Sequence, residues 1–123
     1  MEIEELAEKI MKNMSFLKRV ECRTLAFLLV NAGKYKTSRE IEHTTLSRQP
    51  EVSMALSEFR SRKWITEKQV RKRGGERGRP IKFFKLSKKP EEILDKLIAE
   101  VQESIDSKLK QLENLKKIYE SLN

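Results

Sequence analysis

The segment TSREIEHTTLSRQPEVSMALSEFRSRK, residues 37–63, contains two helix starts close together. The first start has the spacing of a capping box. In such a box the Thr37 side chain accepts from an amide three residues on, and Glu40 reaches back to the cap. The box predicts a short helix that runs to about Leu46. Ile41 and Leu46 are expected to face inward.

A second helix is predicted after the break at residues 47–50, Ser-Arg-Gln-Pro. Pro50 suits the first turn of that helix, because its missing N–H is not needed there. The helix is expected to cover about residues 50–63. Its apolar positions form one stripe, made by Val52, Ala55, Leu56 and Phe59. The opposite face points outward and carries mainly small or polar side chains: Ser53, Met54, Ser57, Arg60 and Ser61.

Two more helices are predicted before this segment. Apolar residues recur at helical spacing at the start of the chain, at Ile3, Leu6, Ile10 and Met14. Residues 20–30 form a more apolar second segment, and Asn31-Ala-Gly33 after it is typical of the end of a helix.

A β-hairpin is predicted after the segment, over about residues 64–88. Residues 64–72 and 81–87 are rich in β-branched and aromatic side chains, as strands are. They flank a loop that holds Gly74, Gly75 and Gly78. We therefore expect two strands joined by a glycine-bearing loop.

The positive charge of the chain is concentrated in its middle. The net charge is +8, yet residues 36–90 hold sixteen Lys or Arg against six acids. Residues 91–123 hold five against eight. Ten of the basic side chains lie within residues 68–89, together with one acid, Glu76. Charge of this density indicates a polyanionic partner, and nucleic acid is the first candidate.

A long last helix is predicted from Pro90 onward, since proline and the acids after it suit a first turn. Its apolar residues follow alternating spacings of four and three: Leu94, Ile98, Val101, Ile105, Leu112, Leu115, Tyr119 and Leu122. Lys108 occupies the one polar position of this series. A heptad seam of this kind is typical of self-association. A helix packed on its own domain is the alternative.

Other classes of protein are disfavoured by the composition. Cys22 and His43 are the only cysteine and histidine, so we expect no disulfide, metal site, cofactor or catalytic centre, and no enzyme. The most apolar run, residues 25–30, is far shorter than the roughly 20 residues of a membrane span. We expect a cytoplasmic protein that does not bind membranes.

Two motifs resemble those of known regulators. Gln49, Pro50, Val52, Ser53 and Leu56 match a Gln-Pro-x-Val-Ser-x-x-Leu pattern found in the recognition helix of ArsR-like and MarR-like transcriptional regulators. Residues 78–87, Gly-Arg-Pro-Ile-Lys-Phe-Phe-Lys-Leu-Ser, resemble the wing of bacterial and archaeal regulators. The likeness covers roughly residues 20–89 and points to a prokaryotic, archaeal source. ArsR-like metal sensors carry paired thiolates, which this chain lacks.

The resemblance implies a mostly α fold with a small β-hairpin: a winged helix-turn-helix domain at residues 1–89 and a coiled-coil-like dimerisation helix at residues 90–123. The recognition helix would enter the major groove of DNA. The side chains expected at base edges are Arg48, Gln49, Ser53, Met54, Ser57 and Arg60. Those expected at the backbone or the minor groove are Arg71, Lys72, Arg73, Arg77, Arg79 and Lys82.

The function expected from these features is sequence-specific binding of double-stranded DNA by a homodimer, as a transcriptional regulator and by default a repressor at the nucleoid. Half-sites would lie about 10 bp apart or a multiple of that. An architectural DNA-binding protein with little sequence preference is the first alternative. A module whose wing binds RNA or an acidic protein is the second. The operator, any effector and the orientation of the paired helices do not follow from the sequence.

Overall fold

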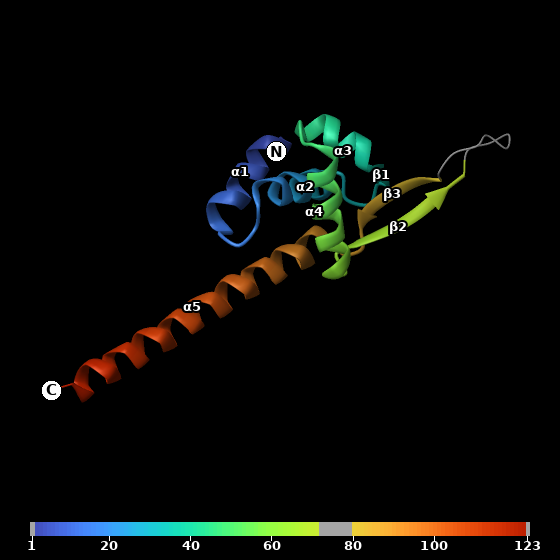
Figure 1. The fold of residues 1–123 in the computed structure, drawn as a ribbon. Helices are drawn as coiled ribbons and strands as arrows, with labels where there is room; N and C mark the ends of the chain where they lie inside the picture. The colour runs from blue at the N-terminus through green and yellow to red at the C-terminus, as the bar shows by residue number, and fades with distance from the viewer. Residues whose placement is uncertain (1, 72–79, 123) are drawn as a thin grey trace. The chain divides into compact units, whose positions relative to one another are not determined.

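Five helices and three short strands form in the part of the chain that the structure, a computed structural model, describes: residues 2–71 and 80–122 (Figure 1). The chain divides into two compact units, Met1–Pro90 and Glu91–Asn123. The first unit contains α1 to α4 and the sheet. The second consists of α5. Each unit is described by itself below.

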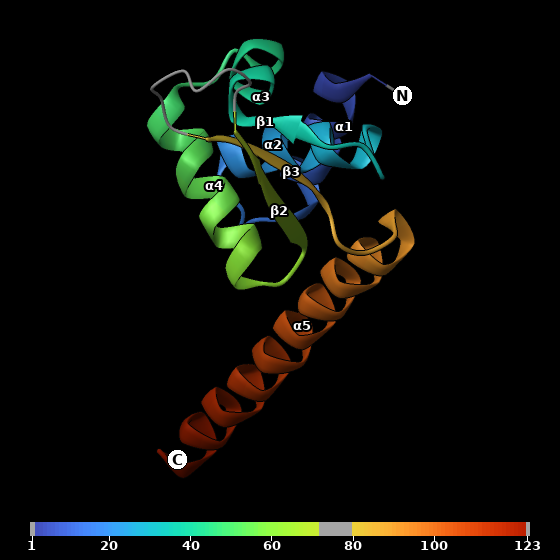
Figure 2. The same cartoon turned by 90° about the vertical axis from the view of Figure 1, so that its right-hand side faces the viewer.

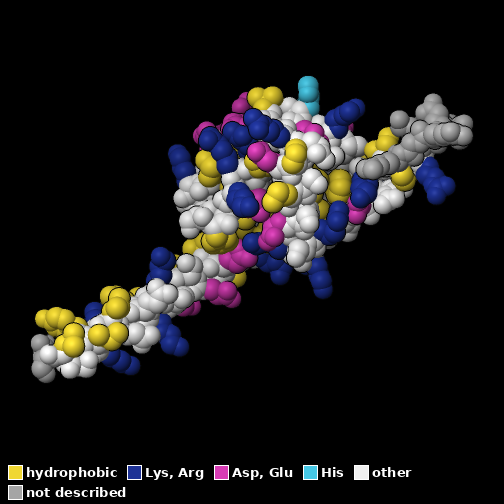
Figure 3. Space-filling model, in the orientation of Figure 1, with side chains coloured by type: hydrophobic (Ala, Val, Ile, Leu, Met, Phe, Trp, Pro, Cys, Tyr) yellow, Lys and Arg dark blue, Asp and Glu magenta, His cyan; other side chains and the backbone are white. Residues whose placement is uncertain are grey.

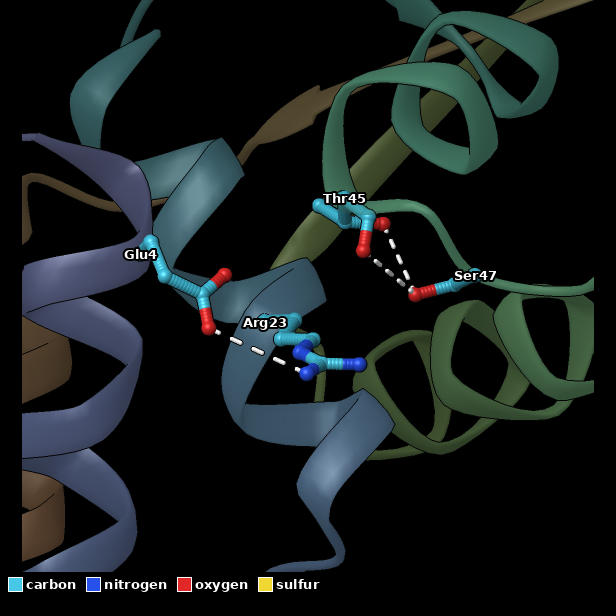
Figure 4. A network of polar contacts seen from close by, with 4 residues as sticks. All are labelled: Glu4, Arg23, Thr45 and Ser47. Carbon is cyan, nitrogen blue, oxygen red and sulfur yellow. Dashed lines mark hydrogen bonds and ion pairs between the residues drawn. The ribbon is translucent and has the colours of Figure 1, made fainter.

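The first two helices confirm the predicted pattern. They are α1 (Ile3–Asn13) and α2 (Arg19–Val30), and they pack against each other. Six side chains of α2 are buried, which makes it the central helix of the unit. An ion pair also joins the two helices, with Glu4 Oε1 3.8 Å from Arg23 Nη2 (Figure 4).

The capping box of the next helix is confirmed, but one inward-facing residue was predicted wrongly. Helix α3 spans Ser38–Thr45; Thr37 Oγ1 accepts from the Glu40 amide at 3.1 Å, and the Glu40 carboxylate accepts from the Thr37 amide at 2.8 Å. Ile41 is buried, as expected, whereas Leu46 is 88% exposed. The helix ends before Leu46, which adopts a left-handed conformation (φ 53°) and so leaves the helical stripe.

Thr45 takes the buried position expected for Leu46. Its hydroxyl donates to the Ile41 carbonyl at 2.6 Å. The same oxygen lies 2.9 Å from Ser47 Oγ (Figure 4). A buried hydroxyl is tolerated when it is hydrogen-bonded. Hydrogen bonds of the Thr45 hydroxyl therefore stabilise the end of α3.

Helix α4 follows the predicted stripe and spans Gln49–Ser61, two residues shorter at its end than expected. Its buried residues are the four predicted ones: Val52, Ala55, Leu56 and Phe59. The chain then turns at Lys63, which has a φ of 63°. The Trp64 amide donates to the Phe59 carbonyl at 2.9 Å and fixes the turn to the helix.

The hairpin is confirmed, but the sheet has three strands and not two. β2 (Ile65–Val70) pairs antiparallel with β3 (Ile81–Leu86), and β3 also pairs with β1 (Lys36–Thr37) in the order β1-β3-β2 (Figure 2). The register places Gln69 opposite Lys82. β1 was not predicted, because two residues cannot display an alternating pattern.

We predict a measurable loss of stability when the α3 cap is removed. Thr37→Ala should lower the free energy of unfolding by about 1 kcal/mol, since the Glu40 amide loses its acceptor. Thermal unfolding followed by circular dichroism measures the change. Thr44→Ala, at an exposed position of the same helix, is the control and should stay within about 0.5 kcal/mol of wild type. Equal values for both variants would contradict a stabilising cap.

Helix α5 spans Pro90–Ser121, and its buried residues are Ile93 and Leu97. Every residue from Gln102 to Leu122 is exposed. Within the described residues, no helix combines the length and the apolar character needed to cross a membrane.

Candidate nucleic-acid interface

A groove of about 950 Å³ lies between α4 and the hairpin of the first unit. The start of α3, the outward face of α4 and one face of the sheet line it. The polar side chains that line it belong to Thr37, Ser38, Arg39, Gln49, Ser53, Ser57, Arg60, Gln69 and Lys82. Hydrogen-bond donors and acceptors therefore share one concave surface with three cations.

Helical spacing brings the α4 side chains to the groove. Gln49, Ser53, Ser57 and Arg60 are separated by four, four and three residues, so they follow one face of the helix. The opposite face holds the buried stripe, so the core fixes which side chains α4 presents.

Strand pairing brings the hairpin side chains to the same groove. Residues directly opposite in an antiparallel pair point to the same face of a sheet, and neighbours along a strand alternate. Glu67 lies opposite Phe84, and Gln69 lies opposite Lys82. These four side chains share the inner face of the hairpin.

An acid connects the cations of the two elements. Glu67 Oε2 lies 3.3 Å from Arg60 Nη2, and Glu67 Oε1 lies 3.6 Å from Lys82 Nζ. The Glu67 side chain is 24% exposed, against 50% for Arg60 and 54% for Lys82. One carboxylate thus holds a cation of α4 and a cation of β3 beside the groove.

The outer face of the hairpin has a different character. Lys68 Nζ lies 4.1 Å from the centre of the Tyr35 ring, and Lys85 Nζ lies 4.7 Å from it. Both distances are within the range of cation–π contacts. These two lysines are held on the face of the sheet opposite the groove.

The structure brings together five of the residues predicted for DNA contact: Gln49, Ser53, Ser57, Arg60 and Lys82. Arg48 and Met54 are exposed but are not among the residues lining the groove, and Arg71 is exposed at the end of β2. The predicted wing residues Lys72, Arg73, Arg77 and Arg79 lie outside the described residues.

Sequence reasoning missed the contributions of α3 and β2. Arg39 and Gln69 line the groove, and Glu67 joins its cations. Arg39 follows the predicted cap by two residues, so its exposed position at the helix start was available as a signal. The sequence contains no signal for Glu67, because its partners, Arg60 and Lys82, belong to α4 and β3.

The predicted dimer residues lie on exposed helix α5. Leu94, Ile98, Ile105, Leu112, Leu115, Tyr119 and Leu122 are exposed, and Val101 is partly so. Figure 3 shows hydrophobic side chains gathered toward the C-terminal end of this helix. Leu109 and Ile118 are also exposed and widen the stripe. Apolar side chains scattered singly over a surface are normal, whereas these side chains lie together along one helix.

Cys22 and His43 occupy ordinary structural positions. Cys22 is buried on α2, and burial, followed by the charge of Glu21, raises the pKa of its thiol. The thiol is therefore protonated near neutral pH and packs as a small apolar group. His43 is exposed on α3. Among residues 2–71 and 80–122, no group of three or more metal-ligating side chains is found.

Solved structures of transcriptional regulators have a similar fold. A possible transcriptional regulator from Methanosarcina mazei matches with a TM-score of 0.59 at 12% identity, over 90% of this chain and 88% of that one. Another transcriptional regulator matches with a TM-score of 0.56 at 22% identity, over 91% and 76%. A mutant of MepR from S. aureus bound to an oligodeoxyribonucleotide matches with a TM-score of 0.51 at 19% identity, over 98% and 90%.

These matches confirm the predicted fold. The chain has a winged-helix fold like that of MarR-like regulators, with mostly helical structure, a small antiparallel sheet and a long C-terminal helix. No protein-family model matches the chain, and no curated protein matches it in sequence.

Proposed function

We propose that this protein binds double-stranded DNA sequence-specifically as a homodimer and regulates transcription. One observation carries the proposal: the outward face of α4, the start of α3 and the inner face of the hairpin form one groove rich in polar and cationic side chains. Similarity of fold to transcriptional regulators, one of them bound to an oligodeoxyribonucleotide, supports it.

The side chains of α4 have the chemistry that base recognition requires. Gln49 pairs bidentately with adenine, Arg60 with guanine, and the two serines accept or donate to either. An α-helix with its side chains is about 10–12 Å in diameter, and the major groove, about 12 Å wide, admits a helix of that diameter. In this arrangement Arg39 and Lys82 flank the helix and contact phosphates.

The acids on α4 fit the same arrangement. Glu58 lies 3.0 Å from Arg62 Nε, and it is not among the residues lining the groove. Glu51 is in the first turn of the helix, where its charge complements the helix dipole.

The exposed stripe of α5 supports self-association. A helix with such a stripe is stable in water when a second apolar stripe covers it. A second copy supplies that stripe and doubles the number of recognition helices. Paired recognition helices read paired half-sites, which matches the symmetry of a pseudo-palindromic operator.

Selection from a random duplex library at about 150 mM salt tests the proposal, because nonspecific electrostatic binding is weakened at that concentration. Enrichment of a palindrome would support a dimeric, sequence-specific regulator and give the half-site spacing. Retention without enrichment would replace it by an architectural role. Absence of retention would direct the search to RNA or protein partners.

The basic segment between the strands is expected to contribute phosphate contacts. Replacing Arg77 and Arg79 by alanine should weaken duplex binding and reduce the salt slope by about two, since each phosphate contact contributes about one. Titrations between low and high salt measure both quantities. The control replaces Lys110 and Lys117, on the side of α5 away from the seam, and removes the same charge. An unchanged slope in the first variant would exclude the segment from the interface.

A further inference from the structure

Glu67 is an acid at the inner face of the hairpin, in a region that is otherwise strongly basic. Residues 36–90 hold sixteen Lys or Arg and six acids. A carboxylate near a phosphate-binding surface repels the phosphates and weakens binding. Its position therefore requires a reason other than affinity.

The contacts of Glu67 supply that reason. Its two oxygens lie 3.3 Å from Arg60 Nη2 and 3.6 Å from Lys82 Nζ. Its own side chain is more buried than either partner, so the pairs are screened less by water than fully exposed ones. Arg60 and Lys82 both line the groove. In the free protein, part of the positive charge of the groove is already neutralised from within.

We propose that Glu67 is a positioning and specificity residue of the DNA groove. It lowers affinity for DNA of arbitrary sequence by occupying Arg60 and Lys82, and it holds the Arg60 guanidinium in place for a base. This inference rests on the proposed function and deepens it, because it concerns the choice of sequence and not the ability to bind.

Nonspecific binding is weakened because it depends on counterions released when cations neutralise phosphates. A lysine or arginine paired with Glu67 must share its charge between the carboxylate and the phosphate. Specific binding is affected less, because a guanidinium has five N–H donors in a fixed fork. With one nitrogen near Glu67, the other donors can face a guanine edge in a fixed orientation.

A purely structural role for Glu67 makes a different prediction. The two ion pairs join α4 to the hairpin, so the carboxylate could act only by holding these elements together. Loss of such a clamp would lower thermal stability and weaken binding to every duplex. It would not strengthen binding to any.

The experiment compares wild type, Glu67→Gln and Glu58→Gln in the full chain. Glu58 is the matched control, because it also pairs with an arginine: its Oε1 lies 3.0 Å from Nε of Arg62, the C-cap residue of α4. The probes are the duplex enriched by selection and a shuffled duplex of the same length and composition. Dissociation constants are measured at several salt concentrations, and thermal unfolding is measured for each variant.

Glu67→Gln is expected to bind the shuffled duplex about tenfold more tightly, with a salt slope larger by about one to two, since two cations become available to phosphates. The preference for the selected duplex should fall by about the same factor. Glu58→Gln should stay close to wild type in both. Glu67→Asp keeps the charge and should recover part of the discrimination. Adding Arg60→Gln to Glu67→Gln should remove part of the gain.

Two results would overturn the inference. If Glu67→Gln leaves the affinity and salt slope for the shuffled duplex unchanged or lowers them, Glu67 is only a structural clamp. If wild type binds both duplexes with the same dissociation constant, it has no sequence preference to which Glu67 could contribute. Failure of wild type to bind either duplex is a separate result, which removes the proposed function itself.

Discussion

Ile105→Asp is expected to convert the proposed homodimer to a monomer and to weaken its binding to a palindromic duplex by about a hundredfold or more. Ile105 lies at the middle of the exposed stripe of α5 and is 48% exposed in the single chain. In a paired seam its side chain would be covered by the partner, and a buried carboxylate without a partner is strongly unfavourable. Loss of the second subunit removes the gain from bivalent binding, which is about 10² to 10⁴. Leu112→Asp should act in the same way.

Sedimentation equilibrium measures the mass of each variant, and binding to the selected duplex is measured in parallel. Lys110→Asp is the matched control, because Lys110 lies on the opposite side of α5 and should leave the dimer intact. A dimeric mass for both Ile105→Asp and Leu112→Asp would contradict the prediction that this stripe forms the dimer interface. A monomeric wild type would show that the exposed stripe serves another purpose.

Among the substitutions proposed here, Phe59→Ala should lower the free energy of unfolding the most. Phe59 is fully buried on α4, and its ring lies 5.7 Å from that of Trp64 at an interplanar angle of 18°. The Ser87 amide donates to the Trp64 carbonyl, so this pair joins the end of α4 to both strands of the hairpin. Removing a buried phenylalanine costs about 3–5 kcal/mol, a large part of the roughly 5–15 kcal/mol that holds a domain together.

The melting temperature of the Phe59→Ala variant is expected to fall by about 15 °C or more. Calorimetry or circular dichroism measures the change. Met54→Ala is the control on the same helix, where the side chain is 64% exposed, and it should stay within about 0.5 kcal/mol of wild type. If the two variants have the same melting temperature, the contact between Phe59 and Trp64 does not stabilise the domain.

Much of the fold followed from the sequence because its signals are local and repeated. The stripe of α4 was predicted completely, since four apolar residues at helical spacing leave one side to bury. The capping box of α3 has a fixed spacing, and it formed as predicted. Leu46 was predicted wrongly because the helix period assigns a side to a residue only while the helix continues.

The candidate site was predictable where one helix face provides it, and Lys82 was predicted because it lies in the basic segment at residues 68–89. The outward face of α4 followed from its buried face, so Gln49, Ser53, Ser57 and Arg60 were found. Glu67 and Gln69 were not, because their contacts depend on the register of the hairpin and on its packing against α4. Whether the named side chains contact DNA stays a prediction.

Thr37 belongs to a strand and a helix at once. Its backbone pairs with Phe83 as the last residue of β1, and its side chain caps α3. No linker residue separates β1 from α3, so a movement of β3 is passed directly to the start of α3. The hairpin and the helix-turn-helix are therefore expected to open and close as one cooperative unit. In the proposed DNA complex, displacement of the hairpin would therefore also loosen α3, and release from DNA is expected to occur in a single step.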